Sequence, residues 1–189
     1  MPRGSLSLIL RKEDKSLLMP RFSLPKLAFL LLAVYAAVHF SADYQQLPEV
    51  VASHFNGRGA ANGWQTKSAF YTVLVGVSVL AAVVGFGIPA IIAALPPQYI
   101  NLPNKRYWLA PERAAETRGF LTSHFAWFGC ALFLLVIVTF DYAIQCNLQP
   151  GNPPSPTRLF LALGGFLLFA ILSTARLFQR FGQVLPGNS

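Results

Sequence analysis

Charged residues are scarce in this chain of 189 amino acids. Only 12% of its residues are charged, against about 25% in an average soluble domain. A disordered chain combines low hydrophobicity with high charge, whereas 54% of this sequence is hydrophobic. The apolar residues also stand in long blocks. The composition therefore excludes a disordered chain, argues against an ordinary soluble domain and predicts an integral membrane protein.

Cysteine and catalytic motifs are scarce as well. The two cysteines, Cys130 and Cys146, make neither a disulfide framework nor a zinc site, and we expect Cys130 to be a small buried packing residue. The sequence holds no nucleophile elbow, no phosphate-cradling glycine loop and no zinc-protease His-Glu-x-x-His motif. We therefore expect a non-enzymatic protein with no cofactor and no metal centre.

Basic residues outnumber acidic ones by 15 to 7, which gives a formal charge of +8. In a soluble protein this balance would suggest nucleic-acid binding. Here the basic residues flank the apolar blocks, and no basic run carries the interleaved aromatic residues of a base-stacking surface. We expect them to orient the chain and to contact anionic lipid headgroups. The predicted partner is the lipid bilayer, and nucleic acid is not expected.

Four apolar blocks predict four transmembrane helices. A spanning helix needs about 17 to 25 mostly apolar residues, and the charge-free blocks cover 27–42, 68–104, 119–140 and 159–175. We predict an all-α integral membrane protein in which a bundle of four helices forms one domain. The predicted spans are about 27–44, 69–95, 119–141 and 159–176, inside a domain of 27–178 with tails at 1–26 and 179–189.

The second block carries residues that shape a membrane helix. Gly76, Gly85 and Gly87 allow close contact with a neighbouring helix, and Pro89 is expected to kink the chain. The first block has a second interpretation, because Lys26 and the apolar run after it resemble a secretory signal cleaved after Ala36. A retained helix is favoured because the small-residue cleavage site is imperfect. A start of translation at Met19 also stays open, since Met19-Pro20-Arg21 repeats the opening Met-Pro-Arg.

The distribution of lysine and arginine predicts the orientation of the spans. The five segments outside the predicted helices carry 6, 2, 4, 1 and 2 basic residues in chain order. Cytoplasmic segments carry the excess of basic residues, so both termini and the loop 96–118 are expected in the cytoplasm. The loop 43–67 then lies outside. Four spans are an even number of crossings, so they also place both termini on the same side of the membrane.

The outer loop 43–67 is the most distinctive stretch of the sequence. Pro48 can open a short helix, and Asn56-Gly57 and Asn62-Gly63 are turn signals. One interpretation is a short helix and turn that lie flat on the membrane as a lid. The other is a recognition element, since loops on rigid scaffolds often carry binding. Its candidate ligand-binding residues are His54, Asn56, Arg58, Trp64 and Lys67.

The same loop resembles a known family. Leu47-Pro48, His54-Phe55-Asn56, Gly59, Asn62-Gly63-Trp64 and Lys67 resemble the motif of a bacterial membrane domain of unknown function. That domain forms the front part of the immunity protein for the sporulation-delaying toxin. The resemblance covers roughly residues 27–95, and the back half of the immunity protein has no counterpart here. It implies a multi-pass protein of the bacterial inner membrane and, weakly, sensing or sequestering of something that arrives from outside.

The inner loop carries a second distinctive run, with polar, basic and aromatic side chains close together. One interpretation is an interfacial anchor, in which aromatic rings lie at headgroup depth and basic groups bind lipid phosphates. The other is a docking face for a cytoplasmic partner. The anchor is preferred, because these residue types are common in any membrane interface. The candidate cytoplasmic interface residues are Asn101, Lys105, Arg106, Tyr107 and Trp108.

Ionisable residues in membrane helices are costly and therefore informative. His39 and Asp43 are spaced i, i+4, so they share a helix face, and Asp141 lies at the outer end of the third span. Such groups can bind a divalent metal, but their spacing matches no compact metal motif, and no metal site is predicted. His124, near the inner end of that span, is expected to be a polar packing residue.

These observations lead to three functional hypotheses. The first is a membrane binding or sensing protein whose outer loop engages a peptide or other envelope ligand. The second is an accessory or structural subunit of a larger membrane complex, with the glycines of the second span at a helix interface. The third and least favoured is a small transporter, in which His39, Asp43 and Asp141 line a polar path.

Overall fold

The computed structural model describes residues 23–56 and 60–183. Most of the two predicted tails lies outside these residues, and so does Arg58. The first long helix, α2, spans Leu24–Tyr44. The second consists of α3 (Lys67–Ala82), a π-helical turn η1 (Val83–Gly87) and α4 (Ile88–Ala94). The third and fourth are α6 (Pro111–Leu148) and α7 (Thr157–Gly182).

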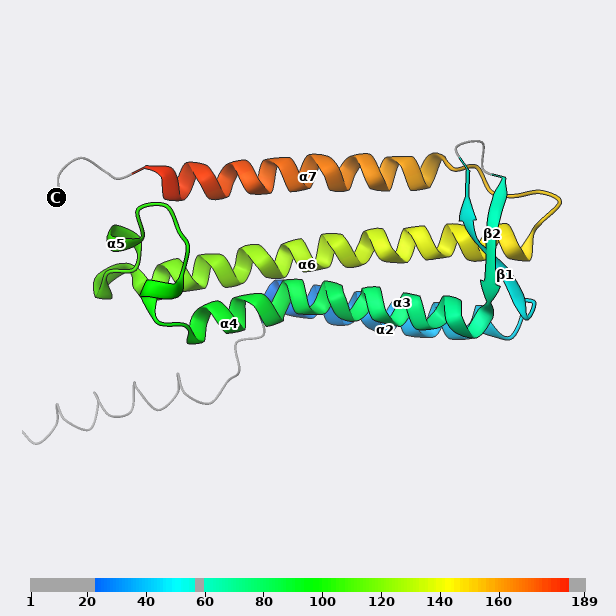
Figure 1. Cartoon of the computed structure of the whole chain (residues 1–189), viewed down its shortest axis with the longest axis horizontal. Helices are drawn as coiled ribbons and strands as arrows, with labels where there is room; N and C mark the ends of the chain where they lie inside the picture. Colours follow the sequence, from blue (N-terminus) through cyan, green and yellow to red (C-terminus); the bar gives the residue numbers. More distant parts are fainter. Residues whose placement is uncertain (1–22, 57–59, 184–189) are drawn as a thin grey trace, which may run out of the picture.

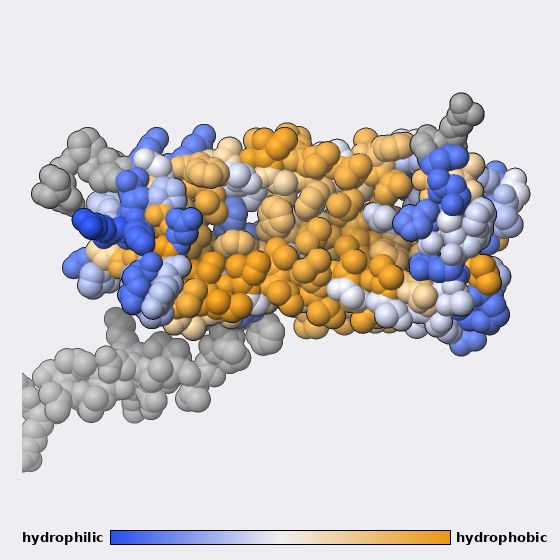
Figure 2. Space-filling model, in the orientation of Figure 1, coloured by the Kyte–Doolittle hydropathy of each residue, from blue (hydrophilic) through white to orange (hydrophobic). Residues whose placement is uncertain are grey.

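Within the described residues, four helices are long and apolar enough to cross a membrane. They run roughly parallel to one another along the length of the molecule (Figure 1). Figure 2 shows a broad hydrophobic middle and hydrophilic side chains gathered at both ends. Large apolar side chains point outward from this middle section, among them Val38, Val75, Leu134 and Leu168. The predicted number of membrane-type helices is therefore confirmed.

Helix α6 is the central element of the bundle. It contacts α2, α3, η1 and α4 on one side and α7 on the other, so that it lies between α7 and the remaining helices (Figure 1). The main core joins Phe40 of α2, Phe70 and Leu74 of α3, and Phe133 and Ile137 of α6. Because every other long helix packs on α6, the two ends of α6 fix the position of whatever is attached there.

Two glycines allow α6 and the second helix to cross at backbone contact. A Cβ built on Gly129 would lie 2.6 Å from the Cα of Gly85 and 3.0 Å from the carbonyl oxygen of Ala81. Gly85 lies in the π turn, which precedes Pro89. Proline has no N–H to donate to the carbonyl four residues earlier, here that of Gly85, and its ring crowds the same carbonyl. The wider π turn accommodates both effects. The predicted close contact holds for Gly85, whereas Gly76 meets no neighbour within 4 Å and Gly87 meets only Val83 of its own helix.

The prediction of an all-α chain is wrong in the loop between the first two long helices. Strands β1 (Val50–Phe55) and β2 (Ala61–Thr66) form an antiparallel hairpin there, in place of the expected short helix and turn. Valine, phenylalanine, tryptophan and threonine favour strands, and the alternation along β1 buries Val51 while Val50 faces outward. Pro48 precedes the strand and begins no helix. The end of the bundle that carries β1 and β2 is called the hairpin end below.

The opposite end is closed by the segment between α4 and α6. It contains a 3-10 turn, η2 (Pro97–Tyr99), and a single helical turn, α5 (Lys105–Trp108). A small second core gathers there, with Phe181 of α7 completely buried. This core joins the segment to α6 and α7 through Ile100, Leu102, Leu109, Leu121 and Phe181. The end of the bundle that carries this core is called the α5 end.

Candidate functional site

The hairpin has a buried face and an exposed face. Val51 is fully buried in the main core, and the ring of Phe55 lies 6.1 Å from that of Tyr142 on α6. On the other face, the side chains of Val50 and Trp64 are 57% and 62% exposed. His54 is also exposed. Because an aromatic and an aliphatic side chain are exposed together here, this face is the candidate contact surface of the hairpin end.

An asparagine on α6 fixes the hairpin to the bundle. The side-chain amide of Asn147 accepts a hydrogen bond from the N–H of Ala52 at 2.7 Å and donates one to the carbonyl of Ala52 at 2.9 Å. Lys67, the first residue of α3, forms an ion pair with Glu49 at 2.8 Å, and its ammonium lies 5.0 Å from the ring centre of Tyr44. The hairpin is therefore tied to all three neighbouring long helices.

The second strand lies on the outer edge of the hairpin. Lys67 and Glu49 form a hydrogen-bonded pair, because the N–H of Lys67 donates to the carbonyl of Glu49. Along an antiparallel ladder, hydrogen-bonded pairs alternate with pairs whose backbone groups point away from each other. Ala52 and Trp64 oppose each other, and Ala52 directs its backbone groups to Asn147. By the same alternation, the backbone N–H and C=O of Trp64 point away from β1. Beside the exposed indole, β2 thus presents a strand edge of the kind to which an extended peptide can add.

The predicted ligand-binding residues of this loop fall into two groups. Asn56 closes the hairpin, since its backbone N–H donates to the carbonyl of Ala60 and its side-chain oxygen accepts from the N–H of Ala60. Lys67 is engaged by Glu49 and Tyr44. His54 and Trp64 are exposed, and the imidazole of His54 lies over Gly63, where a Cβ would come within 3.1 Å of it. Because Gly63 and Trp64 are neighbours along β2, their side-chain directions lie on opposite faces of the hairpin. Trp64 therefore lies on the contact face, His54 is exposed on the Gly63 side, and Asn56 and Lys67 belong to the supporting framework.

Three ionisable side chains meet just below the hairpin. Nε2 of His39 lies 2.8 Å from Oδ1 of Asp141 and 3.8 Å from Oδ2 of Asp43. The i, i+4 spacing predicted the second contact, while the first joins α2 to α6. Asp43 is buried, and its Oδ2 has no hydrogen-bond partner. Neither this cluster nor any other group of His, Cys, Asp and Glu side chains among the residues that the structure describes is arranged to hold a metal ion.

The cluster of His39, Asp43 and Asp141 is confined to the hairpin end. Further along α6 toward the α5 end, the inward positions are Ile137 and Phe133, which belong to the main core. A polar path for a small transporter would have to continue past these apolar side chains. The arrangement instead supports a local role, in which the cluster joins α2 to α6 directly beneath the hairpin.

The predicted cytoplasmic interface residues lie at the α5 end, where some are structural. Nε1 of Trp108 donates to the carbonyl of Phe181 at 3.3 Å. The guanidinium of Arg113 lies 4.0 Å above the ring of Tyr107, and Nζ of Lys105 donates to the carbonyl of Gln98. Three of the predicted residues, Asn101, Lys105 and Arg106, are exposed.

Asn104, which was not among the predicted residues, also connects the α5 end to α7. Asn104 has the left-handed backbone conformation, with φ at 52°, and its side-chain amide donates to the carbonyls of Phe181 and Gly182 at 2.9 and 3.3 Å. These carbonyls belong to the last turn of a helix, where no intrahelical donor remains for them. Asparagine tolerates the left-handed region better than other non-glycine residues, which is the one signal the sequence offered.

Comparison with known proteins locates a family match in the first part of the chain. A family model described as "Domain of unknown function (DUF1648)" matches residues 27–79. This region contains most of α2, the whole hairpin and the larger part of α3. No curated protein matches the chain, and no solved structure matches it. The family description names no activity, ligand or partner.

Proposed function

We propose that this chain is a non-enzymatic binding protein of the bacterial inner membrane, with both termini in the cytoplasm and the hairpin outside. The hairpin would engage a peptide or another ligand of the cell envelope. The orientation follows from the excess of basic residues in segments 1–26 and 96–118. The family match covers the hairpin, and the sequence motif there resembles the front domain of toxin immunity proteins.

The observation that carries the proposal is the exposed indole of Trp64 beside the open edge of β2. Tryptophan is among the residues that contribute most to binding energy at interfaces. Peptides that add a strand to a sheet edge gain affinity from backbone hydrogen bonds and specificity from side-chain contacts. Because Asn147 and Lys67 hold the hairpin in place, the edge is preorganised, which lowers the entropic cost of binding.

The orientation is tested by labelling single cysteines in intact cells. Cys130 and Cys146, which are buried, are replaced by alanine, and Asn62→Cys or Tyr99→Cys is introduced at an exposed position of the hairpin end or the α5 end. A membrane-impermeant maleimide is expected to label the Asn62→Cys protein in intact cells and the Tyr99→Cys protein only after permeabilisation. The reverse pattern would place the hairpin in the cytoplasm and remove the proposal.

The binding role is tested with the sporulation-delaying toxin as the probe. The full chain is reconstituted in lipid nanodiscs, and its affinity for the toxin peptide is measured together with the survival of a toxin-sensitive strain that produces it. We expect Trp64→Ala to weaken binding by about tenfold or more. Tyr99→Ala, which removes an exposed aromatic ring at the opposite end, serves as the matched control. No measurable binding and no protection would overturn the toxin as the ligand.

A second candidate function is that of an accessory subunit in a larger membrane complex. It is supported by a groove of about 640 Å³ between α2 and α3, lined mainly by apolar side chains such as Phe29, Leu74 and Val79. A partner helix could lie in such a groove, because small residues at Ala33, Ala36 and Ala37 permit close approach. Native mass measurement after gentle extraction tests it, and a lone monomer would remove this candidate.

A further inference from the structure

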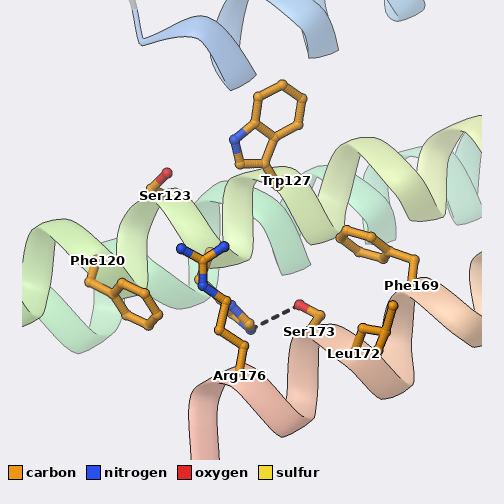
Figure 3. A pocket seen from close by; sticks show the side chains of 8 residues that line it. Phe120, Ser123, Trp127, Phe169, Leu172, Ser173 and Arg176 are labelled. Carbon is orange, nitrogen blue, oxygen red and sulfur yellow. Dashed lines mark hydrogen bonds between the residues drawn. The ribbon is translucent and has the colours of Figure 1, made fainter. Parts of the chain in front are cut away.

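A cleft of about 410 Å³ separates α6 from α7 near the α5 end. Figure 3 shows Arg176 reaching from α7 toward α6, with Ser123 on the opposite helix. The hydroxyl of Ser173 lies 3.4 Å from Nε2 of His124 and so connects the two helices across the cleft. One end of the cleft is therefore lined by a guanidinium, an imidazole and two hydroxyl groups, which are all able to donate hydrogen bonds to an anion.

The positive charge in this cleft has no acidic neighbour in its lining. Among the described residues that line the cleft, none is an aspartate or a glutamate. The nearby carboxylate of Glu116 is already bound by Arg180 at 2.6 Å. An adjoining cleft of about 440 Å³ shares Phe120 and Arg176 with the first and adds Arg180 and two glutamine side chains, Gln179 and Gln183. The guanidinium group of Arg176 thus borders both clefts.

Away from Arg176 the lining becomes apolar. Trp127, Phe169 and Leu172 form the other end of the first cleft. Trp127 and Phe169 also line a third cleft, of about 470 Å³, whose remaining walls are the alanine, leucine and cysteine side chains of α2 and α6. The polarity of the surface therefore changes along the helices, from cationic near the α5 end to purely apolar toward the middle of the bundle.

The depth of Arg176 matches that of lipid headgroups. Arg176 follows directly on the charge-free run 159–175 of α7, and 17 helical residues span about 26 Å. On α6 the charge-free run begins at Gly119, five residues before His124. Both positions lie where the hydrocarbon core of a bilayer, about 30 Å thick, gives way to the headgroup layer. Arginine at this depth binds phosphate oxygens with its planar fork of donors.

We propose that this surface is a binding site for one anionic phospholipid of the leaflet at the α5 end. Arg176 holds the phosphate, Ser123, His124 and Ser173 donate hydrogen bonds to it, and an acyl chain lies along Trp127 and Phe169. The charge complementarity commits the site to an acidic headgroup, such as phosphatidylglycerol. The inference requires the helices to lie in a bilayer, and it does not depend on peptide binding by the hairpin.

The test is native mass spectrometry of the full chain with defined lipids. The purified protein is mixed with phosphatidylglycerol or with phosphatidylcholine of the same acyl chains, and the retained lipid is counted at increasing collision energy. We expect the wild-type chain to retain one phosphatidylglycerol about tenfold more strongly than phosphatidylcholine. Equal retention of the two lipids would overturn the proposal. This comparison uses only the wild-type chain, so its result does not depend on whether a variant folds.

Two arginine variants on the same helix then locate the site. Arg176→Gln removes the cleft cation, whereas Arg158→Gln makes the same change at the hairpin end of α7. The preference for phosphatidylglycerol is expected to disappear in Arg176→Gln, to weaken in Arg176→Lys, which keeps the charge but loses the fork, and to stay unchanged in Arg158→Gln. Equal losses in Arg176→Gln and Arg158→Gln would indicate a general charge effect and overturn the assignment.

Competition with inorganic phosphate separates a lipid site from a simple anion site. A bound phospholipid gains affinity from its acyl chains, so excess phosphate is expected to leave it in place. Trp127→Ala removes part of the proposed acyl contact and is expected to make the lipid easier to displace. If phosphate alone displaced the lipid from the wild-type chain, the cleft would be an anion site without lipid specificity, and the proposal would be wrong.

Discussion

The side-chain amide of Asn147 pairs with both backbone groups of Ala52, accepting from its N–H at 2.7 Å and donating to its carbonyl at 2.9 Å. A third strand would pair with β1 in the same way, so the end of α6 satisfies one edge of the hairpin. The same amide also donates to the carbonyl of Ala143 in its own helix, which fixes the orientation of the side chain. At this pair of residues, the backbone edge that stays open is that of Trp64 on β2.

Replacing Asn147 by alanine should loosen the hairpin without disrupting the helices. The change leaves the N–H and carbonyl of Ala52 without their partner, and a lost buried hydrogen bond costs about 1–3 kcal/mol. We expect the amide of Ala52 to exchange its hydrogen faster and the free energy of unfolding in detergent to fall. Asn152→Ala, in the exposed connection before α7, is the control. Equal amide exchange in both variants would contradict the anchoring role.

Because α6 crosses the second helix at backbone contact, two glycines of α6 should respond differently to replacement by alanine. A Cβ at Gly129 would lie 2.6 Å from the Cα of Gly85, whereas a Cβ at Gly119 would meet nothing within 4 Å. Gly129→Ala should therefore force the backbones apart and lower stability by about 1–3 kcal/mol. Gly119→Ala should be neutral or stabilising by up to about 1 kcal/mol, because alanine is the better helix former.

The measurement for this glycine pair is the unfolding midpoint in detergent. Gly85→Ala is expected to fall between the other two variants, since its Cβ would lie 3.1 Å from the Cα of Gly129. Similar midpoints for Gly129→Ala and Gly119→Ala would show that the backbones separate at no cost. The close contact would then not be a specific packing interaction.

The sequence was sufficient to predict the long helices, because each depends on a local property. An uninterrupted apolar run determines a membrane helix almost alone, and i, i+4 spacing placed His39 next to Asp43. The hairpin was missed because a proline before Val50 is compatible with a helix start as well as with a strand. The deciding contact, from Asn147 to Ala52, joins residues 95 positions apart, and no local pattern reveals it.

The residues that resemble the family motif mostly build the hairpin. Leu47 is buried in the main core, Gly63 leaves room for the ring of His54, and Lys67 pairs with Glu49. Such residues would be required by any protein that forms this hairpin, whatever it binds. Trp64 is the motif residue on the contact face of the strands. A motif made mostly of residues that build a fold can therefore be recognised without identifying a ligand.

Asn104 offers a test that separates backbone conformation from hydrogen bonding. Asn104→Gly keeps the left-handed conformation and loses only the hydrogen bonds to the end of α7, which should cost about 1 kcal/mol. Asn104→Ala loses the same bonds and adds about 1–2 kcal/mol of backbone strain. We therefore expect the order wild type, Gly, Ala in unfolding free energy. If the two variants were equal, the left-handed conformation would carry no cost at this position.

The link between His39 and Asp141 predicts a measurable coupling between α2 and α6. Their side chains are 29% and 38% exposed, and solvent screening limits such a pair to about 0.5–1 kcal/mol. A double-mutant cycle with His39→Ala and Asp141→Ala, followed by unfolding in detergent, measures this coupling. The control cycle pairs His39→Ala with Thr139→Ala, because the hydroxyl of Thr139 bonds to Leu135 of its own helix. Coupling in the first cycle alone would show that the polar contact joins the helices, and equal coupling in both would assign the effect to general packing.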